Sequence, residues 1–255
     1  MTSVTNRVKS VPQPRGGYLS SKLFVKQQLD SKRELVDEPN MRGGSALGIT
    51  VDYFSRFMLG ENPRQAWQIS LAGAEMIDQS ETADKLLAQI TGLNDQSLQA
   101  AYRLAGFDVV RRSGLAHFQN VMGPDFELST ADLTNLTILV ERVMAFFDQF
   151  GKPIHSGMVF AGGYTNVIST GDADFMASET LWDLKVVKSN VLNKNNKLQI
   201  LVYYLMGLHS IDEADYLQLD SIGFFNPREN AVYRCKISTI PDEVIDEVTT
   251  KVIGY

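Results

Sequence analysis

Two aspartates and a lysine stand close together near residue 180, and their types suit one kind of chemistry. Asp174 lies in the segment DADFMAS, and Asp183 and Lys185 lie in the next segment, ETLWDLKVV. Carboxylate oxygens are the ligands that Mg²⁺ prefers, and a metal held by them can bind a phosphate and activate a water. A neighbouring lysine can orient that water or stabilise the charge that develops on the phosphate. These residues predict metal-dependent hydrolysis of a phosphodiester bond.

The spacing of these residues indicates how they converge. Both segments favour strands, and turn-prone residues separate them. The eight residues between Asp174 and Asp183 fit a hairpin, so the two carboxylates can meet across it. Asp183 and Lys185 are two apart on one strand and therefore point to the same face. Asp172 stays open as an alternative ligand to Asp174.

The elements that must position this group form an α/β pattern. Ser129 and Asp132 make a capping-box pattern that opens a helix ending near Phe150. Strand-like segments follow, then a helix, two further strands and a last helix. This order predicts an α/β (α+β) core with a mixed central sheet flanked by helices. The expected ranges are about 130–150 (helix), 157–187 (three strands), 194–208 (helix), 221–226 and 231–238 (strands) and 241–252 (helix).

The first half of the chain predicts a different organisation. Residues 1–45 are punctuated by Pro and Gly, which favours an irregular N-terminal arm with a short helix near Phe24–Leu29. Residues 46–128 are expected to be mostly helical, because Gly60 and Gly106 end helical patterns there. The expected domains are therefore the arm 1–45, a helical part 46–128 and an α/β core 129–255, with the last two forming one compact unit. The expected helices of the middle part are 46–59, 63–78, 81–91 and 95–105.

Composition limits the classes of protein that fit. Hydrophobic residues make up 44% of the 255 residues and the net charge is −6. No apolar run approaches the roughly 18 residues that span a bilayer, and the start lacks the apolar stretch of a secretory signal, so we expect a cytoplasmic protein without a membrane partner. The single cysteine, Cys235, excludes an internal disulfide and a cysteine-based zinc site. The net negative charge argues against a broad basic surface that would bind a polyanion. Carboxylates that hold a metal also contribute to this negative charge, so it does not exclude a metal site that contacts a polyanion.

At these residues the sequence resembles the PD-(D/E)xK nucleases, and within them the RecB-like and Cas4-like branch. The matching residues are Asp174, then Asp183-Leu-Lys185, then Gln199-Ile-Leu-Val-Tyr203. In that family an Asp ends one strand, an acidic-x-Lys motif follows on the next, and a helix carries Q-x-x-x-Y. The resemblance covers about residues 130–255. It implies a restriction-endonuclease-like core and a nuclease that hydrolyses DNA with Mg²⁺ or Mn²⁺ as cofactor.

The resemblance also implies roles for single residues. Asp174 and Asp183 would hold the metal, with the Leu184 carbonyl as a further ligand. Lys185 would act on the water or the transition state. Gln199 and Tyr203 are four apart, share one helix face, and would position these groups or the DNA strand.

The fourth metal ligand is where this sequence departs from the branch. An upstream helix there usually carries G-x-x-x-H, whose His touches metal, whereas this chain has Gly48-Ile-Thr-Val-Asp52. Asp52 is the expected ligand at this place, and Glu141 is the alternative. Residues 61–128 would then be an insertion between that helix and the core.

Two further expectations concern partners. Lys185, Lys188, Lys194 and Lys197 cluster beside the candidate site in the sequence and could meet DNA phosphates. The acidic balance and the missing His also allow an alternative function. In that alternative the fold is a catalytically inactive nuclease-fold module that binds nucleic acid or a protein partner.

Overall fold

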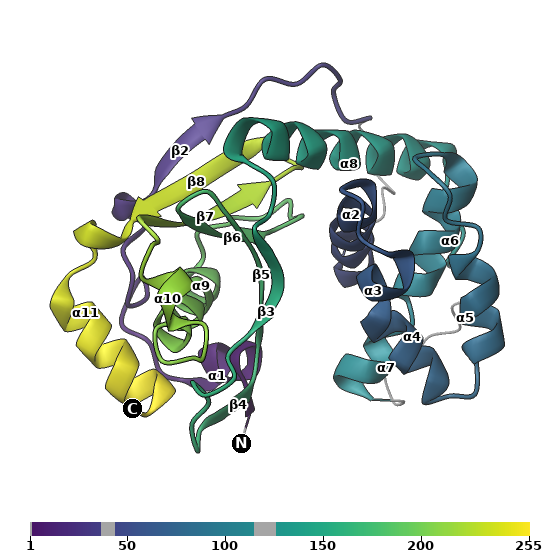
Figure 1. Cartoon of the computed structure of the whole chain (residues 1–255). Coiled ribbons are helices and arrows are strands. Elements are labelled where there is room, and N and C mark those ends of the chain that lie inside the picture. The colour runs from purple at the N-terminus through teal and green to yellow at the C-terminus, as the bar shows by residue number, and fades with distance from the viewer. Residues whose placement is uncertain (1, 37–43, 115–125) are drawn as a thin grey trace. The chain divides into compact units, whose positions relative to one another are not determined.

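The computed structural model describes residues 2–36, 44–114 and 126–255, and the chain divides into two compact units. An α/β unit comprises Met1–Asp30 and Phe147–Tyr255, and a helical unit comprises Ser31–Phe146. Both are drawn in Figure 1. Residues 37–43 of the expected arm and 115–125 of the expected helical part lie outside the described residues.

A six-stranded mixed sheet forms the centre of the α/β unit. Its order is β2-β8-β7-β6-β5-β3, and the pairs are antiparallel except β6–β7, which is parallel. Every residue of β7 is buried, as expected for a central strand that has a parallel neighbour. The predicted mixed sheet is therefore confirmed. The strands are β2 (Val25–Gln28), β3 (His155–Val159), β5 (Asp172–Ala177), β6 (Thr180–Leu184), β7 (Ser221–Asn226) and β8 (Ala231–Lys236).

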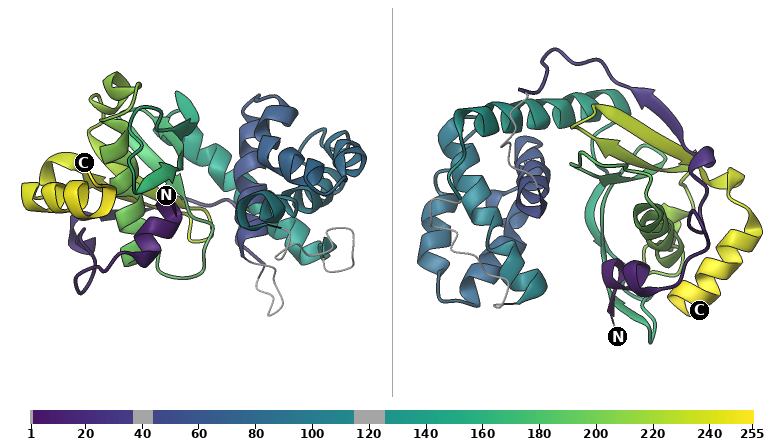
Figure 2. Two further views of the ribbon diagram at one scale, coloured as in Figure 1. Left: turned by 90° about the horizontal axis from the view of Figure 1, so that it is seen from below. Right: turned by 180° about the vertical axis from the view of Figure 1, so that it is seen from behind.

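A helical crossover joins the two parallel strands, because parallel neighbours need a long connection. It contains α9 (Lys194–Gly207) and the short α10 (Glu213–Tyr216). Apolar residues cover nearly all sides of α9, and a helix of this kind is stable only when it is enclosed. In Figures 1 and 2, α9 lies within the curve of the sheet, with α11 (Asp242–Glu247) nearby. A π-helical turn, Val248–Ile253, continues α11, so the expected last helix at 241–252 is present in two pieces.

The other face of the sheet is covered by the end of α8 (Thr130–Phe150). Phe147 packs edge-on against Phe175 of β5, with ring centroids 5.0 Å apart. Phe150 packs in the same manner against Trp182 of β6, at 5.5 Å. The sheet thus carries helices on both faces, with α9 on one side and the end of α8 on the other.

The N-terminal residues are part of the α/β unit. α1 (Val4–Ser10) begins at Ser3, whose hydroxyl accepts from the Asn6 nitrogen, and β1 (Thr2–Ser3) pairs with β4 (Ile168–Thr170). The predicted short helix near Phe24–Leu29 is wrong. Residues Val25–Gln28 form the edge strand β2 instead, after a 3₁₀ turn at Ser21–Leu23. Pairing with the distant β8 overrides the local preference, and local sequence does not report that pairing.

The helical unit agrees closely with the expected helices. α6 has the expected range, Asp95–Ala105, and the expected helix at 63–78 is divided at Trp67. The capping box is present at the start of α8, because Ser129 Oγ accepts from the Asp132 nitrogen and Asp132 Oδ2 accepts from the Ser129 nitrogen, both at 3.1 Å. The other helices are α2 (Ser45–Met58), α3 (Pro63–Ala66), α4 (Gln68–Glu75), α5 (Ser80–Leu87) and α7 (Asp108–Ser113).

The unit boundaries differ from the expected domains. Residues up to Asp30 belong to the α/β unit, and the first part of α8 belongs to the helical unit. That residues 46–128 form one compact unit with the core stays a prediction. None of the helices in the described residues combines the length and apolar character that crossing a membrane requires.

Candidate active site

The hairpin of β5 and β6 brings Asp174 and Asp183 together. Its register pairs Phe175 with Trp182, and the next residues outward on the two strands are Asp174 and Asp183. Residues opposite each other in an antiparallel pair point to the same face, with Cβ atoms about 5 Å apart. Only Ser178 and Glu179 join the paired residues Ala177 and Thr180, so the short turn sets this register. The register therefore places Asp174 and Asp183 at neighbouring positions on one face of the hairpin, whereas a contact between the two carboxylates stays a prediction.

The carboxylate of Asp174 reaches the end of the neighbouring strand. Its Oδ2 accepts a hydrogen bond of 2.6 Å from the backbone nitrogen of Leu184. Asp174 is half-buried, whereas Asp172, two residues earlier on the same strand, is exposed. Because the two residues share a face of β5, Asp172 adds a third carboxylate to the same side.

Asp183 and Lys185 form an ion pair at the end of β6. Lys185 Nζ lies 2.7 Å from Asp183 Oδ2, and the Asp183 residue is only 3% exposed. The backbone nitrogen of Lys185 donates to the carbonyl of Phe225 at 2.9 Å, which extends the pairing of β6 with β7 by one residue. Because of this bond, the backbones of both Asp183 and Lys185 are held by the sheet.

Burial and charge act against each other at this pair. Burial raises the pKa of Asp183, and the neighbouring Lys185 ammonium opposes that rise. Burial alone would lower the pKa of Lys185, but the charges of Asp183, Asp174 and Asp172 outweigh it and hold that pKa above its usual value. Lys185 is therefore a cation surrounded by carboxylates. A divalent cation at this place would also be favoured by those charges.

Helix α9 carries Gln199, which contacts Lys185, and Tyr203, which contacts Gln199. Gln199 Oε1 accepts from Lys185 Nζ at 3.2 Å. Its Nε2 donates to Tyr203 Oη at 3.0 Å and to Thr5 Oγ1 at 2.9 Å. Asn193 caps the helix by accepting from the nitrogens of the two residues that follow Lys194. The two helix residues that the resemblance implies therefore lie in one network with Lys185.

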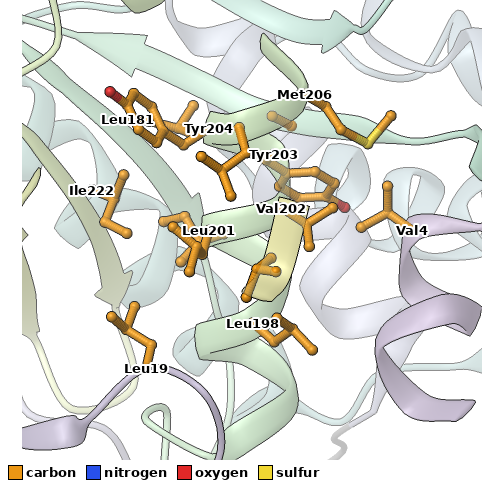
Figure 3. Close-up of a cluster of buried hydrophobic side chains, with 14 of the residues drawn as sticks. Val4, Leu19, Leu181, Leu198, Leu201, Val202, Tyr203, Tyr204, Met206 and Ile222 are labelled. Atoms are coloured by element: carbon orange, nitrogen blue, oxygen red, sulfur yellow. The ribbon is translucent and has the colours of Figure 1, made fainter. Parts of the chain in front are cut away.

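Tyr203 is enclosed by apolar side chains. Its ring stacks on Phe160, with centroids 5.4 Å apart and planes inclined by 20°. Figure 3 shows Tyr203 among the apolar residues of α9 and on the same side as Val4. Burial raises the pKa of Tyr203 well above its usual value, and the charges of Asp183, Asp172 and Asp174 add to the effect. The phenol therefore stays protonated and acts as a hydrogen-bonding group.

The two alternatives for the fourth ligand belong to the helical unit. Asp52 lies on α2, where its charge acts on the neighbouring Arg56 and Tyr53. Glu141 lies on α8 and forms a two-oxygen ion pair with Arg33, at 3.0 and 3.1 Å. Each acid thus has a cationic neighbour within its own unit. The assignment of either one to a metal stays a prediction.

The lysines beside the site differ in exposure. Lys188 and Lys194 are exposed, as a phosphate contact requires. Lys197 is only 2% exposed, and its Nζ donates to the Gly16 carbonyl at 3.1 Å and to Ser21 Oγ at 2.8 Å. The expectation that Lys197 meets a phosphate is therefore wrong. This lysine faces inward and ties the N-terminal segment to α9.

The residues at the hairpin suit a hard divalent cation. Asp174 and Asp183 offer carboxylate oxygens, which Mg²⁺ and Mn²⁺ prefer, and Mg²⁺ keeps several waters when few protein ligands are present. Within residues 2–36, 44–114 and 126–255, no group of three or more His, Cys, Asp or Glu side chains is arranged to hold a metal. A site here would rest on Asp183 with Asp174, or with Asp172 in place of Asp174, together with water and the backbone. The Leu184 carbonyl as a further ligand stays a prediction.

Thr5 is the member of this network that the sequence did not indicate. It lies on α1, within residues expected to be an irregular arm. A signal was present, because Ser3 suits a helix N-cap and Val4 and Val8 are four apart, as on one helix face. The helix has only seven residues, so its pattern is too short to be distinctive.

Neither a family model, nor a curated protein, nor a solved structure matches the chain.

Proposed function

We propose that this chain is a metal-dependent nuclease of the PD-(D/E)xK type that hydrolyses phosphodiester bonds in DNA. The observation that carries the proposal is the convergence of Asp174, Asp183 and Lys185 on one face of the β5–β6 hairpin, with Lys185 Nζ 2.7 Å from Asp183 Oδ2. The order of elements also supports it. A strand hairpin is followed by a helix that carries Gln199 and Tyr203, which is the order that the resemblance implies.

Each residue of the site has a separate task in this proposal. Asp174 and Asp183 bind Mg²⁺ or Mn²⁺, which when bound supplies positive charge to the scissile phosphate and makes a water more acidic. Lys185 stabilises the negative charge that develops on the phosphate. Gln199 accepts from the Lys185 ammonium and holds it on the reacting side of the hairpin. Tyr203 supports Gln199 from the apolar core.

A second candidate function follows from the same ion pair. Lys185 compensates the buried charge of Asp183 without a metal, so the pair is also consistent with a nuclease-fold module that binds nucleic acid or a protein partner and does not cut. The two candidates differ in one measurable property. The nuclease requires a divalent cation at Asp174 and Asp183, whereas the binding module does not.

The test is cleavage by the purified full chain. Single- and double-stranded DNA and RNA are incubated with Mn²⁺, with Mg²⁺ or with EDTA. We expect metal-dependent cleavage of DNA that Asp183→Asn and Lys185→Ala each reduce at least about 100-fold. The matched controls are Asp242→Asn on α11 and Lys236→Ala on β8, both exposed in the same unit. Cleavage that survives in Asp183→Asn, or none in any wild-type reaction, would overturn the proposal.

A further inference from the structure

The amide of Gln199 has only one orientation that satisfies its neighbours. Lys185 Nζ has only hydrogens to offer, so it must face the amide oxygen and not the amide nitrogen. The observed contact, from Lys185 Nζ to Gln199 Oε1, follows this rule. The amide nitrogen is consequently directed to the hydroxyls of Tyr203 and Thr5, which act as acceptors. Both hydroxyls thus secure the end of the side chain that faces away from the lysine.

Thr5 is held in place by the fold and not by the site. Val4 and Val8, its neighbours on α1, are fully buried in the core of the α/β unit. Arg7 donates to the carbonyls of Val252 and Lys251, at 2.8 and 2.7 Å, which ties α1 to the C-terminal helical segment. The helix that carries Thr5 is therefore held both by its buried valines and by the hydrogen bonds of Arg7.

From these contacts we infer that Thr5 is a positioning residue of the proposed nuclease site. It acts through Gln199, because its hydroxyl fixes the amide that receives the Lys185 ammonium. The inference rests on the proposed function and extends the site from the hairpin and α9 to the N-terminal helix. Removal of the hydroxyl leaves the Gln199 nitrogen with Tyr203 as its acceptor, so the amide and the ammonium become less well ordered.

Two substitutions separate this role from a structural one. Thr5→Val keeps the shape of the side chain and removes the acceptor, whereas Thr5→Ser keeps the acceptor. Thr250→Val is the matched control, because Thr250 is an exposed helical threonine whose hydroxyl bonds only a backbone carbonyl of its own segment among the described contacts. In Thr5→Val we expect kcat for DNA cleavage to fall about two- to tenfold with KM unchanged, the range for one lost hydrogen bond. Thr5→Ser and Thr250→Val should cleave like the wild type.

A second readout does not depend on cleavage. The side-chain amide resonances of Gln199 are assigned by their loss in Gln199→Leu and followed by NMR without metal. We expect them to shift in Thr5→Val and to stay in place in Thr5→Ser and Thr250→Val. Unmoved resonances in Thr5→Val would overturn the inference, as would equal cleavage by Thr5→Val and wild type. If the wild type cuts nothing, the proposed function fails, and the amide resonances alone then decide whether Thr5 orders Gln199.

Discussion

The backbone nitrogen of Leu184 donates a 2.6 Å hydrogen bond to Asp174 Oδ2, so a side chain of β5 holds the last residue of β6. The bond links the candidate metal ligand to the strand that carries Asp183. A carboxylate offers about four lone-pair positions, so this bond is compatible with a cation on the same group. Asp174 therefore has a structural task and a proposed chemical one, and the two can be separated by substitution.

Asp174→Asn and Asp174→Ala should differ in stability but not in activity. Asparagine keeps an oxygen that can accept from Leu184, so the free energy of unfolding should change little. Alanine removes the acceptor from a partly buried backbone N–H, which should cost about 1–2 kcal/mol. Both variants should lose cleavage. Alanine has no oxygen that could bind Mg²⁺, and the amide of asparagine is a poor ligand for Mg²⁺ compared with a carboxylate. Urea unfolding without metal checks the difference, and equal stabilities would show that the Leu184 bond contributes nothing.

The ion pair of Asp183 and Lys185 should show a non-additive effect on stability. Lys185→Met leaves the buried carboxylate without its cation and should destabilise the protein by about 2–3 kcal/mol. This loss is smaller than that expected for a fully buried ion pair, because the Lys185 side chain is 22% exposed to solvent. The double variant Asp183→Asn with Lys185→Met removes both charges and should recover much of that loss. Thermal unfolding without metal measures the wild type, the single variants Asp183→Asn and Lys185→Met, and the double variant, and additive effects would contradict a coupled pair.

The part of the site that the sequence predicted depends on local geometry. Asp183 and Lys185 are two apart on a strand, and a period of two is enough to place them on one face. Asp174 required the register of a hairpin, which a two-residue turn determines within a few residues of chain. Strand periodicity and turn length are thus enough to predict the positions of the carboxylates and the lysine, whatever the rest of the fold.

The features that the sequence missed depend on distant residues. β2 is a strand because Val25 pairs with Arg234, about 200 residues away, and nothing in the exposed segment itself shows this partner. Thr5 joins the site for a similar reason, since Gln199 lies 194 residues further along the chain. The unit boundary within α8 was also missed, because the helix continues without a break across it.

Metal binding should raise the melting temperature in a way that tests the ligands. With Mn²⁺ at about 100 times its dissociation constant, wild type should gain about 2.7 kcal/mol of stability. Asp183→Asn should remove this gain. If Asp52 completes the site, Asp52→Asn should weaken Mn²⁺ binding while Glu141→Gln leaves it unchanged. Calorimetric titration of the full chain with Mn²⁺ measures each affinity.

The ligand assignment has two contrary outcomes in that titration. Weaker binding in Glu141→Gln and not in Asp52→Asn would transfer the assignment to Glu141. Unchanged binding in both variants would leave Asp174 and Asp183, with water and backbone, as the protein part of the site. Loss of the Arg33 ion pair in Glu141→Gln is a small effect at an exposed position, so it should not disturb the comparison.

A buried carboxylate in the helical unit should make stability depend on pH. Asp108 is fully buried, and its Oδ2 accepts from Tyr53 Oη at 2.9 Å and from Arg112 Nε at 3.1 Å. Ser70 Oγ donates to its other oxygen. Burial raises the pKa of Asp108 above 3.8, and the hydrogen bonds and the Arg112 charge only partly offset the rise. The folded protein therefore holds this proton up to a higher pH than the unfolded chain does.

The sign of the effect follows from this difference in proton binding. The stability contribution of Asp108 is complete below pH 3.8 and declines as the pH rises through the folded-state pKa, because ionisation is easier in the unfolded chain. Asp108→Asn keeps the shape of the group and cannot ionise. The free energy of unfolding of wild type relative to that of Asp108→Asn should thus decrease as the pH rises from 4 to 7. Urea unfolding of both proteins over this pH range measures the difference. The same comparison for Asp78→Asn, at an exposed position with φ 58° that asparagine tolerates, should be much flatter. A wild-type advantage that grows with pH would show that the hydrogen bonds outweigh burial.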